Sequence, residues 1–336
     1  MTQPILVTGA AGFIGAAISE RLVAQGETVV GIDNLNDYYS QELKRSRLER
    51  IQHSNFDFKE QDISNETEIA ELFATIKPKS VIHLAAQAGV RYSIENPNAY
   101  IKSNILGFMQ ILEGCRHQKV NHLVYASSSS VYGGYTNLPF HESQSVNHPV
   151  SLYAATKKSN ELMAHTYSHL YGISATGLRF FTVYGPWGRP DMAPMLFAEA
   201  VLKGKPIRIF NYGKMRRDFT YIDDIVEGIL RVLDKPPSSN PSCDKTNPDP
   251  AASWAPHRVF NIGNSSPVPL MDFIGDLEEA LGVEAIKQFE PMQPGDVQAT
   301  AADTSALEAW VGFRPMTDIK DGTREFALWY KSYFAG

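Results

Sequence analysis

A tyrosine and a lysine four residues apart provide the most direct chemistry in this sequence. Tyr153 and Lys157 lie in the segment Ser-Leu-Tyr-Ala-Ala-Thr-Lys, and residues i and i+4 share one face of a helix. A phenol ordinarily has a pKa of about 10, and a nearby ammonium group favours its ionised form. Tyr153 is therefore a candidate general base near neutral pH, although the spacing alone also fits an exposed helical pair.

A run of serines supplies hydroxyl groups that can work beside such a base. The segment 126–133, Ala-Ser-Ser-Ser-Ser-Val-Tyr-Gly, follows an apolar run that ends near Tyr125. Parallel strands present ligands to the crevice at their carboxyl ends. Hydroxyl groups there can hold a substrate oxygen while Tyr153 removes its proton. The alternative is an ordinary serine-rich turn.

A glycine-rich turn near the N-terminus predicts the second reactant. Gly9-Ala-Ala-Gly-Phe-Ile-Gly15 follows the apolar run 5–7 and opens a helix-like run over 16–24, and a second apolar run ends in Asp33. Such glycines let a pyrophosphate approach the backbone at a helix N-terminus. An acid after the second strand accepts hydrogen bonds from an adenosine ribose. Because a carboxylate repels a 2′-phosphate, we expect NAD rather than NADP. An ordinary glycine-rich turn is the alternative.

Strand-like and helix-like runs alternate through the first half of the chain. We expect strands at 4–8, 28–33, 55–59, 80–84, 122–127 and 175–180, and helices at 13–25, 40–52, 66–76, 97–118 and 151–171. This alternation predicts an α/β fold, a Rossmann-type doubly wound parallel sheet, with a smaller C-terminal α+β substrate domain.

The alternation of strand-like and helix-like runs becomes less regular after residue 185, where prolines are frequent. A helix opening at 223–224 and a late strand at 258–262 return to the sheet. We therefore expect an NAD-binding domain over 1–185 and about 221–264. We expect a second, substrate-binding domain over 186–220 and about 265–336. The stretch 236–256 is rich in proline, serine and asparagine and reads as a surface loop.

Composition narrows the class of protein. The 336 residues are 43% hydrophobic and 20% charged, which is typical of a globular protein. A net charge of −6 gives no basic face for nucleic acid. Two distant cysteines suggest a reduced, cytoplasmic protein, and we expect neither a signal peptide nor a membrane helix. His165 and His169 are four residues apart without a third ligand, so a helix-surface or dimer-interface role is favoured and no metal is expected.

With these segments in place, the chain resembles the extended short-chain dehydrogenase/reductase enzymes that act on nucleotide sugars. The likeness spans essentially the whole chain, and the G-x-x-G-x-x-G spacing is the form typical of these enzymes. In 4-epimerases of this group a catalytic hydroxyl lies three residues before the valine of V-Y-G and 25 before the tyrosine, which is Ser128 here. The resemblance implies a catalytic set of Ser128, Tyr153 and Lys157. It implies an NAD site made of Gly9, Ala11, Gly12, Phe13, Ile14, Gly15, Asp33, Asn34, Asp62, Ile63, Leu84, Ala85, Ala86, Gln87, Tyr153 and Lys157.

Four longer segments resemble UDP-glucuronate 4-epimerases more narrowly: 33–39, 87–92, 185–190 and 212–218. That likeness implies conversion of UDP-glucuronate to UDP-galacturonate through a 4-keto intermediate with tightly bound NAD. A 4-keto uronic acid tends to lose carbon dioxide, so we expect hydroxyl groups and a neighbouring arginine to hold its carboxylate near the ring plane. The implied substrate site is Arg91, Ser127, Ser128, Thr182, Arg189, Arg217, Gln293 and Asp296.

Several alternatives stay open at this point. Related dehydratases carry an acidic pair before V-Y-G, and Ser129 and Ser130 stand there instead, so dehydration is disfavoured. A UDP-glucuronate decarboxylase, another UDP-sugar 4-epimerase, a dehydrogenase that releases NADH and an NAD-binding regulator remain. By resemblance, the helices at 97–118 and 151–171 pair with their copies in a homodimer.

Overall fold

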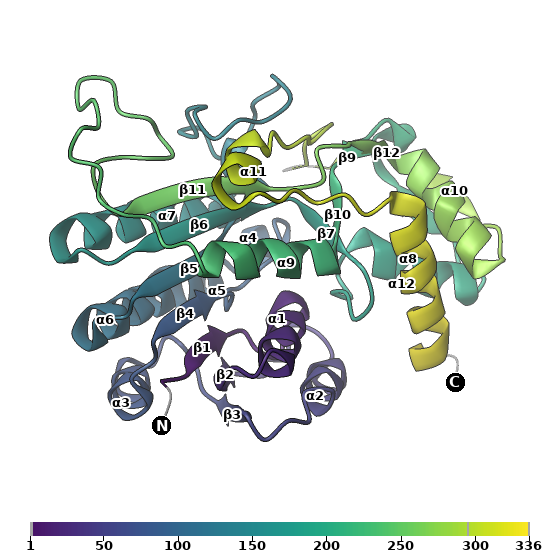
Figure 1. Ribbon diagram of the computed structural model, residues 1–336. Coiled ribbons are helices and arrows are strands. Elements are labelled where there is room, and N and C mark those ends of the chain that lie inside the picture. The colour runs from purple at the N-terminus through teal and green to yellow at the C-terminus, as the bar shows by residue number, and fades with distance from the viewer. Residues whose placement is uncertain (1–2, 294–295, 335–336) are drawn as a thin grey trace.

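The computed structural model describes residues 3–293 and 296–334, and within them the centre of the molecule is a parallel sheet of seven strands (Figure 1). The strand order is β11-β6-β5-β4-β1-β2-β3, and every neighbouring pair is parallel. Because the direction of winding reverses between β1 and β4, a crevice opens at the carboxyl ends of these strands. The strands are β1 (Ile5–Thr8), β2 (Val29–Asp33), β3 (Phe56–Glu60), β4 (Ser80–His83), β5 (His122–Ser128), β6 (Ala175–Phe180) and β11 (His257–Ile262).

Helices cover both faces of this sheet (Figure 1). One face carries α1 (Phe13–Ala24), α9 (Ile222–Leu233) and α11 (Ser305–Val311), with α2 (Gln41–Glu49) beside α1. The other face carries α3 (Glu66–Ile76), α6 (Phe108–Gln118) and α7 (Leu152–Tyr171). Along β1, Ile5 and Val7 enter the core of the first face and Leu6 enters the core of the second. Burial on both faces explains why residues 5–7 of β1 are continuously apolar.

A smaller α+β region packs around a core of its own, in which Phe219 and Phe273 stack at 4.6 Å. Its elements are α8 (Ala193–Leu202), β8 (Ile207–Ile209), the 3₁₀ turn η3 (Phe210–Gly213), β9 (Arg216–Arg217), β10 (Phe219–Tyr221), β12 (Val268–Pro269), α10 (Leu270–Leu281), β13 (Lys287–Phe289) and α12 (Ile319–Phe334). Strand β7 (Thr182–Tyr184) pairs with β10 and leads from the sheet into this region. Helix α11 packs on the main sheet although it lies in the stretch expected for the second domain. The domain boundaries remain a prediction.

The helix expected over 97–118 is interrupted. The chain forms α4 (Tyr92–Glu95), α5 (Pro97–Tyr100), a π-helical turn η1 (Ile101–Gly107) and then α6. The widened turn carries Asn104, whose side chain accepts from the Gln87 amide at 2.8 Å and donates to the Gln87 carbonyl at 3.0 Å. Apolar periodicity does not distinguish a π turn from an α turn, so this interruption of the helix could not be predicted from the sequence.

Helix α7 has well-defined ends. The Ser151 hydroxyl accepts a hydrogen bond from the Ala154 amide at 3.1 Å, and Gly172 closes the helix in a left-handed conformation. The loop 236–256 covers part of this helix, because Ser253 bonds His165 at 2.7 Å and Trp254 donates to His169 at 3.0 Å. Among the described residues, none of the helices has the length and apolar character to cross a membrane.

Candidate active site

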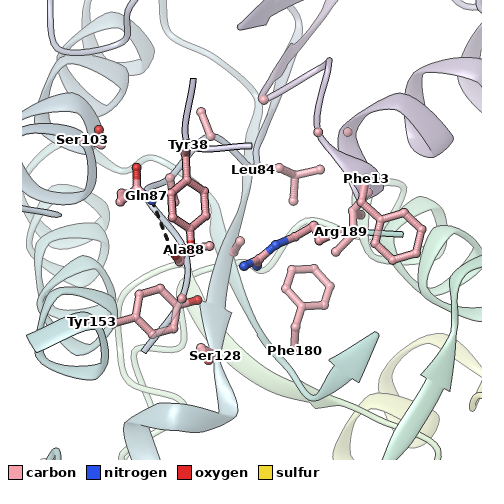
Figure 2. A pocket seen from close by; sticks show the side chains of 18 of the residues that line it. Phe13, Tyr38, Leu84, Gln87, Ala88, Ser103, Ser128, Tyr153, Phe180 and Arg189 are labelled. Atoms are coloured by element: carbon pink, nitrogen blue, oxygen red, sulfur yellow. Dashed lines mark hydrogen bonds between the residues drawn. The ribbon is translucent and has the colours of Figure 1, made fainter. Parts of the chain in front are cut away.

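Most of the predicted site residues line one cleft of about 350 Å³ at the carboxyl ends of the central strands (Figure 2). The predicted residues in its wall are Gly9, Gly12, Phe13, Ile14, Gly15, Asp33, Asn34, Ile63, Leu84, Ala85, Ala86, Gln87, Ser127, Ser128, Tyr153, Lys157, Thr182 and Arg189. The walls therefore bring the glycine turn, the serine run and the tyrosine–lysine pair to one place.

The glycine turn is tightly packed and leads into α1. Gly9 adopts φ +73°, and a Cβ there would lie 2.8 Å from the Ala85 nitrogen. A Cβ at Gly15 would lie 1.9 Å from the Gly9 carbonyl oxygen, so a side chain at this position would break the turn. The α1 N-cap, Gly12, offers no side-chain cap, which leaves the first helical amides available to a phosphate. This donor set fits the pyrophosphate of a dinucleotide.

Asp33 lies at the end of β2, on the ribose side of that turn. Its carboxylate accepts hydrogen bonds from the Leu35 amide at 2.9 Å and the Ala11 amide at 3.3 Å. Burial raises the pKa of Asp33, while these amides and the nearby Lys44 and Arg47 act in the opposite direction. Ala11 therefore supports the acid and is not itself part of the cleft wall.

Tyr153 stands in the first turn of α7, facing the end of β5. Figure 2 shows its ring beside Ser128 on the same side of the cleft. The Ser128 hydroxyl donates to the Ser130 hydroxyl and accepts from the Ser130 amide, both at 3.1 Å, as the chain enters the 3₁₀ turn η2 (Ser129–Tyr132). Lys157, one turn further along α7, donates from Nζ to the Ala126 carbonyl at 2.9 Å.

The electrostatics of this pair differ from the sequence-based argument. Burial raises the pKa of Tyr153, and the groups that lower it are a hydrogen bond with Ser128 and the charge of Arg189. Desolvation lowers the pKa of the buried Lys157 to about 8. Arg189, which lies outside α7, is thus a cation that acts on this phenol.

Arg189 projects into the cleft from the segment after β7 (Figure 2). Its guanidinium donates two hydrogen bonds to Asp191, at 3.1 and 2.5 Å, and the Tyr38 hydroxyl donates to the same carboxylate at 3.1 Å. Asp191 raises the pKa of Arg189, so the guanidinium stays charged. Sequence reasoning missed Asp191 and Tyr38. The short R-x-D spacing was a usable signal for Asp191, but none connected Tyr38 to it.

Ser127 lies in the cleft wall with its proton already committed. Its hydroxyl donates to Glu161 Oε1 at 2.7 Å, and only 2% of the residue is exposed. Glu161 in turn forms a buried ion pair with Arg179. Because a serine hydroxyl has one proton, Ser127 can accept a hydrogen bond from a ligand but has no free donor for one.

A fully buried arginine joins the cofactor turn to the segment that carries Arg189. Arg47 of α2 donates to the Ala11 carbonyl at 3.1 Å and to the Tyr39 hydroxyl at 2.8 Å. It also donates to the carbonyls of Trp187, at 2.7 and 3.0 Å, and Gly188, at 2.9 Å. These neutral acceptors satisfy its five donors.

The remaining predicted residues lie outside the cleft wall. Asp62 accepts a hydrogen bond from the Ser64 amide and forms an ion pair with Lys102 at 3.1 Å. Asp296 brings two predicted substrate-binding arginines together, because it pairs with Arg91 at 3.0 Å and approaches Arg217 to 4.0 Å. The Asp296 amide donates to the Gln293 carbonyl at 3.3 Å. Arg91, Arg217, Gln293 and Asp296 thus form a connected group outside the cleft wall.

The parallel sheet, the glycine turn and the tyrosine–lysine pair define a dinucleotide-dependent α/β enzyme. Residues 5–263 match the model of the NAD dependent epimerase/dehydratase family, and the chain belongs to that family. It is 54% identical to Protein CapI of Staphylococcus aureus (98% of this chain, 99% of that protein). It is 49% identical to UDP-glucuronate 4-epimerase 4 of Arabidopsis thaliana (99% of this chain, 76% of that protein).

Among solved structures, the UDP-glucuronic acid 4-epimerase of Bacillus cereus, in complex with UDP-glucuronic acid and NAD, superposes with a TM-score of 0.88. The two sequences are 34% identical, and the match covers 98% of this chain and 100% of the other. The protein is accordingly an isomerase, an epimerase that uses NAD. These comparisons confirm the predicted fold class, the enzyme class and the cofactor.

Proposed function

We propose that the protein converts UDP-glucuronate to UDP-galacturonate at C4 with tightly bound NAD. The observation that carries this choice is the charged guanidinium of Arg189 in the same cleft as Tyr153 and Thr182. Asp191 accepts two of its five N–H donors, and the others can meet a ligand. A sugar carboxylate is the natural partner of an arginine at that place, since guanidinium and carboxylate groups match in geometry and charge. The relatives named as UDP-glucuronate 4-epimerases support the same substrate.

Tyr153 is proposed as the base that accepts the proton of the 4-hydroxyl, with Ser128 holding that oxygen by a hydrogen bond. The chemistry that bound NAD would supply is hydride transfer, away from C4 on oxidation and back to C4 on reduction. Lys157 is proposed to orient the nicotinamide ribose, because its Nζ lies in the cleft wall beside the tyrosine. The 4-keto sugar then turns within the cleft, and Tyr153 returns the proton to the oxygen on reduction.

The 4-keto intermediate of a uronic acid is a β-keto acid and loses carbon dioxide when its carboxylate stands perpendicular to the ring. We propose that Ser128, Thr182 and Arg189 hold the carboxylate near the ring plane. Ser127 contributes as an acceptor at most, because its proton is directed to Glu161. Arg217 is proposed to meet the UDP phosphates, and Arg91 to close over the site or to face the sugar carboxylate. Gln293 and Asp296 are proposed to contact the uridine ribose.

Two chemical alternatives share this site. A decarboxylase would place a proton donor near C5 and release a UDP-pentose, and another UDP-sugar 4-epimerase would bind a neutral sugar. One incubation separates them: enzyme with UDP-glucuronate and no added NAD, followed by identification of the sugar nucleotide. UDP-galacturonate without carbon dioxide supports the proposal. A UDP-pentose, or turnover of UDP-glucose alone, contradicts it.

We further propose that the enzyme is a homodimer in a reducing compartment, the cytoplasm. Cys115 is buried and Cys243 lies in the 236–256 loop, and both are free thiols. We also propose that the NAD-binding domain comprises 1–185 and about 221–264, and the UDP-sugar domain 186–220 and about 265–336.

A further inference from the structure

The Asp33 carboxylate accepts hydrogen bonds from two backbone amides of the kind that bind anions. The Leu35 and Ala11 amides each donate to one of its two oxygens, at 2.9 and 3.3 Å. Leu35 adopts φ +47°, a left-handed conformation that side-chain-bearing residues take at a cost. The backbone turns sharply here, and its amide points back at the end of β2. Two convergent amides suit any small anion, not only a carboxylate.

A lysine from α2 faces the same edge of the cleft. Lys44 is 4% exposed and lies in the cleft wall with Asp33. Its ammonium group donates to the Asn36 carbonyl at 2.6 Å and the Asn36 side chain at 2.8 Å. Within residues 3–293 and 296–334 it forms no ion pair at 4.0 Å or less. The carboxylates that act on it from further away are Asp33 and the exposed Asp37.

Arg47 adds a second positive charge one turn along α2. All its donors go to carbonyl and hydroxyl oxygens, so no hydrogen-bonded carboxylate neutralises it. Lys44 and Arg47 both act on Asp33. Without the Asp33 carboxylate, this edge would keep two cations and two backbone donors around the position that an adenosine ribose takes in this fold.

We propose that Asp33 fills an anion site built by the Ala11 and Leu35 amides, and that Lys44, which lies at the same edge of the cleft without contacting Asp33, is a cofactor-specificity residue that can receive the 2′-phosphate of NADP when the Asp33 carboxylate is absent. Asp33 then acts in two ways. It binds the ribose hydroxyls of NAD, and it occupies and neutralises a site that would otherwise attract a phosphate. The choice between NAD and NADP therefore depends on the Asp33 carboxylate, which covers an edge of the cleft that could otherwise bind a phosphate.

The test compares nucleotide retention, which does not depend on the sugar substrate. Wild-type holoenzyme, D33S, D33S/K44M and D33S/R45M are incubated with an equimolar mixture of NAD and NADP and desalted, and the retained nucleotides are quantified by chromatography. Arg45 is the matched control, because it is a cation of the same helix that is exposed and lies outside the cleft wall.

We expect D33S to raise the retained NADP-to-NAD ratio about tenfold, which corresponds to one charge-assisted hydrogen bond. K44M in the D33S background should remove most of that gain, and R45M should change it less than about twofold. The proposal is overturned if D33S/K44M retains as much NADP as D33S, if R45M has the same effect as K44M, or if D33S gains no NADP. Should D33S fail to fold, D33N with the same two second substitutions gives the same comparison.

Discussion

Glu161 of α7 and Arg179 of β6 form a buried ion pair with two hydrogen bonds, of 2.8 and 2.9 Å. Burial raises the pKa of Glu161, but the charge of Arg179 and its hydrogen bonds outweigh that effect and bring the pKa to about 2. The carboxylate also accepts from Ser127, so the pair supports the wall of the active-site cleft from behind.

The E161Q variant should lower the free energy of unfolding at pH 7 by about 3–5 kcal/mol, because Arg179 would remain buried without its counter-ion. A pKa lowered by folding stabilises the protein above the unfolded value near 4.5, and that contribution disappears as the pH falls toward 2. Denaturant unfolding of the wild type should therefore lose more stability between pH 5 and 3 than that of E161Q. The exposed pair Glu279–Lys320 supplies a control, since solvent screens both charges and E279Q should leave stability nearly unchanged. Equal losses in the two variants would show that burial does not matter here.

Replacing Tyr153 by phenylalanine should reduce turnover by about 10²–10⁴-fold while leaving NAD and UDP binding largely intact, because the hydroxyl is the proposed base. Steady-state epimerisation and nucleotide retention measure the two effects. Tyr171, at the exposed end of the same helix, is the control, and Y171F should remain active. A Y153F enzyme with more than about a tenth of the wild-type rate would rule out the assignment.

Thr182→Val should change the fate of the 4-keto intermediate. Each hydrogen bond lost from the carboxylate is worth on the order of 1 kcal/mol, and more for a charged acceptor. That is enough to alter a branching ratio about fivefold or more. Carbon dioxide, UDP-4-keto-pentose and NADH released per epimerisation should therefore rise. Loss of both outcomes in equal proportion would make Thr182 an ordinary binding residue.

The homodimer proposal concerns apolar side chains on the outer surface of η1, α6 and α7. Ile101, Met109 and Leu162 are exposed there by 43%, 37% and 58%. Exposed apolar groups gathered on neighbouring helices suit a self-complementary interface. Light scattering at micromolar concentration should give a dimer that L162R dissociates. L328R, on α12 with 57% exposure, should leave the mass unchanged. A monomeric wild type would remove the proposal.

Local sequence patterns were sufficient to predict most of the fold. The glycine turn, the acid after β2 and the tyrosine–lysine helix are each written within a few residues, and the expected strands agree with β1 to β6 and β11 to within two residues. The return of β11 to the main sheet was predicted because an apolar run reappears after the loop, whereas its pairing with β6 was not predicted. Periodicity and turn chemistry are sufficient for such elements.

The contacts that refine the site could not be predicted in the same way. Tyr38 reaches Asp191 across 153 positions, and Ser127 reaches Glu161 across 34. Such pairs depend on how the loops at the carboxyl ends of different strands lie against each other, which no local pattern encodes. This is why Ser127 was expected to donate to a substrate, whereas its proton belongs to a buried carboxylate.

Arg47 has a consequence for how the enzyme handles its intermediate. One guanidinium is bonded to the Ala11 carbonyl in the cofactor turn and to the Trp187 and Gly188 carbonyls, two residues before Arg189. Arg47 thereby links the glycine turn to the segment that carries Arg189. For the proposed reaction, in which a 4-keto sugar has to present its opposite face, we expect these two segments to keep their relative position while the sugar rotates between them.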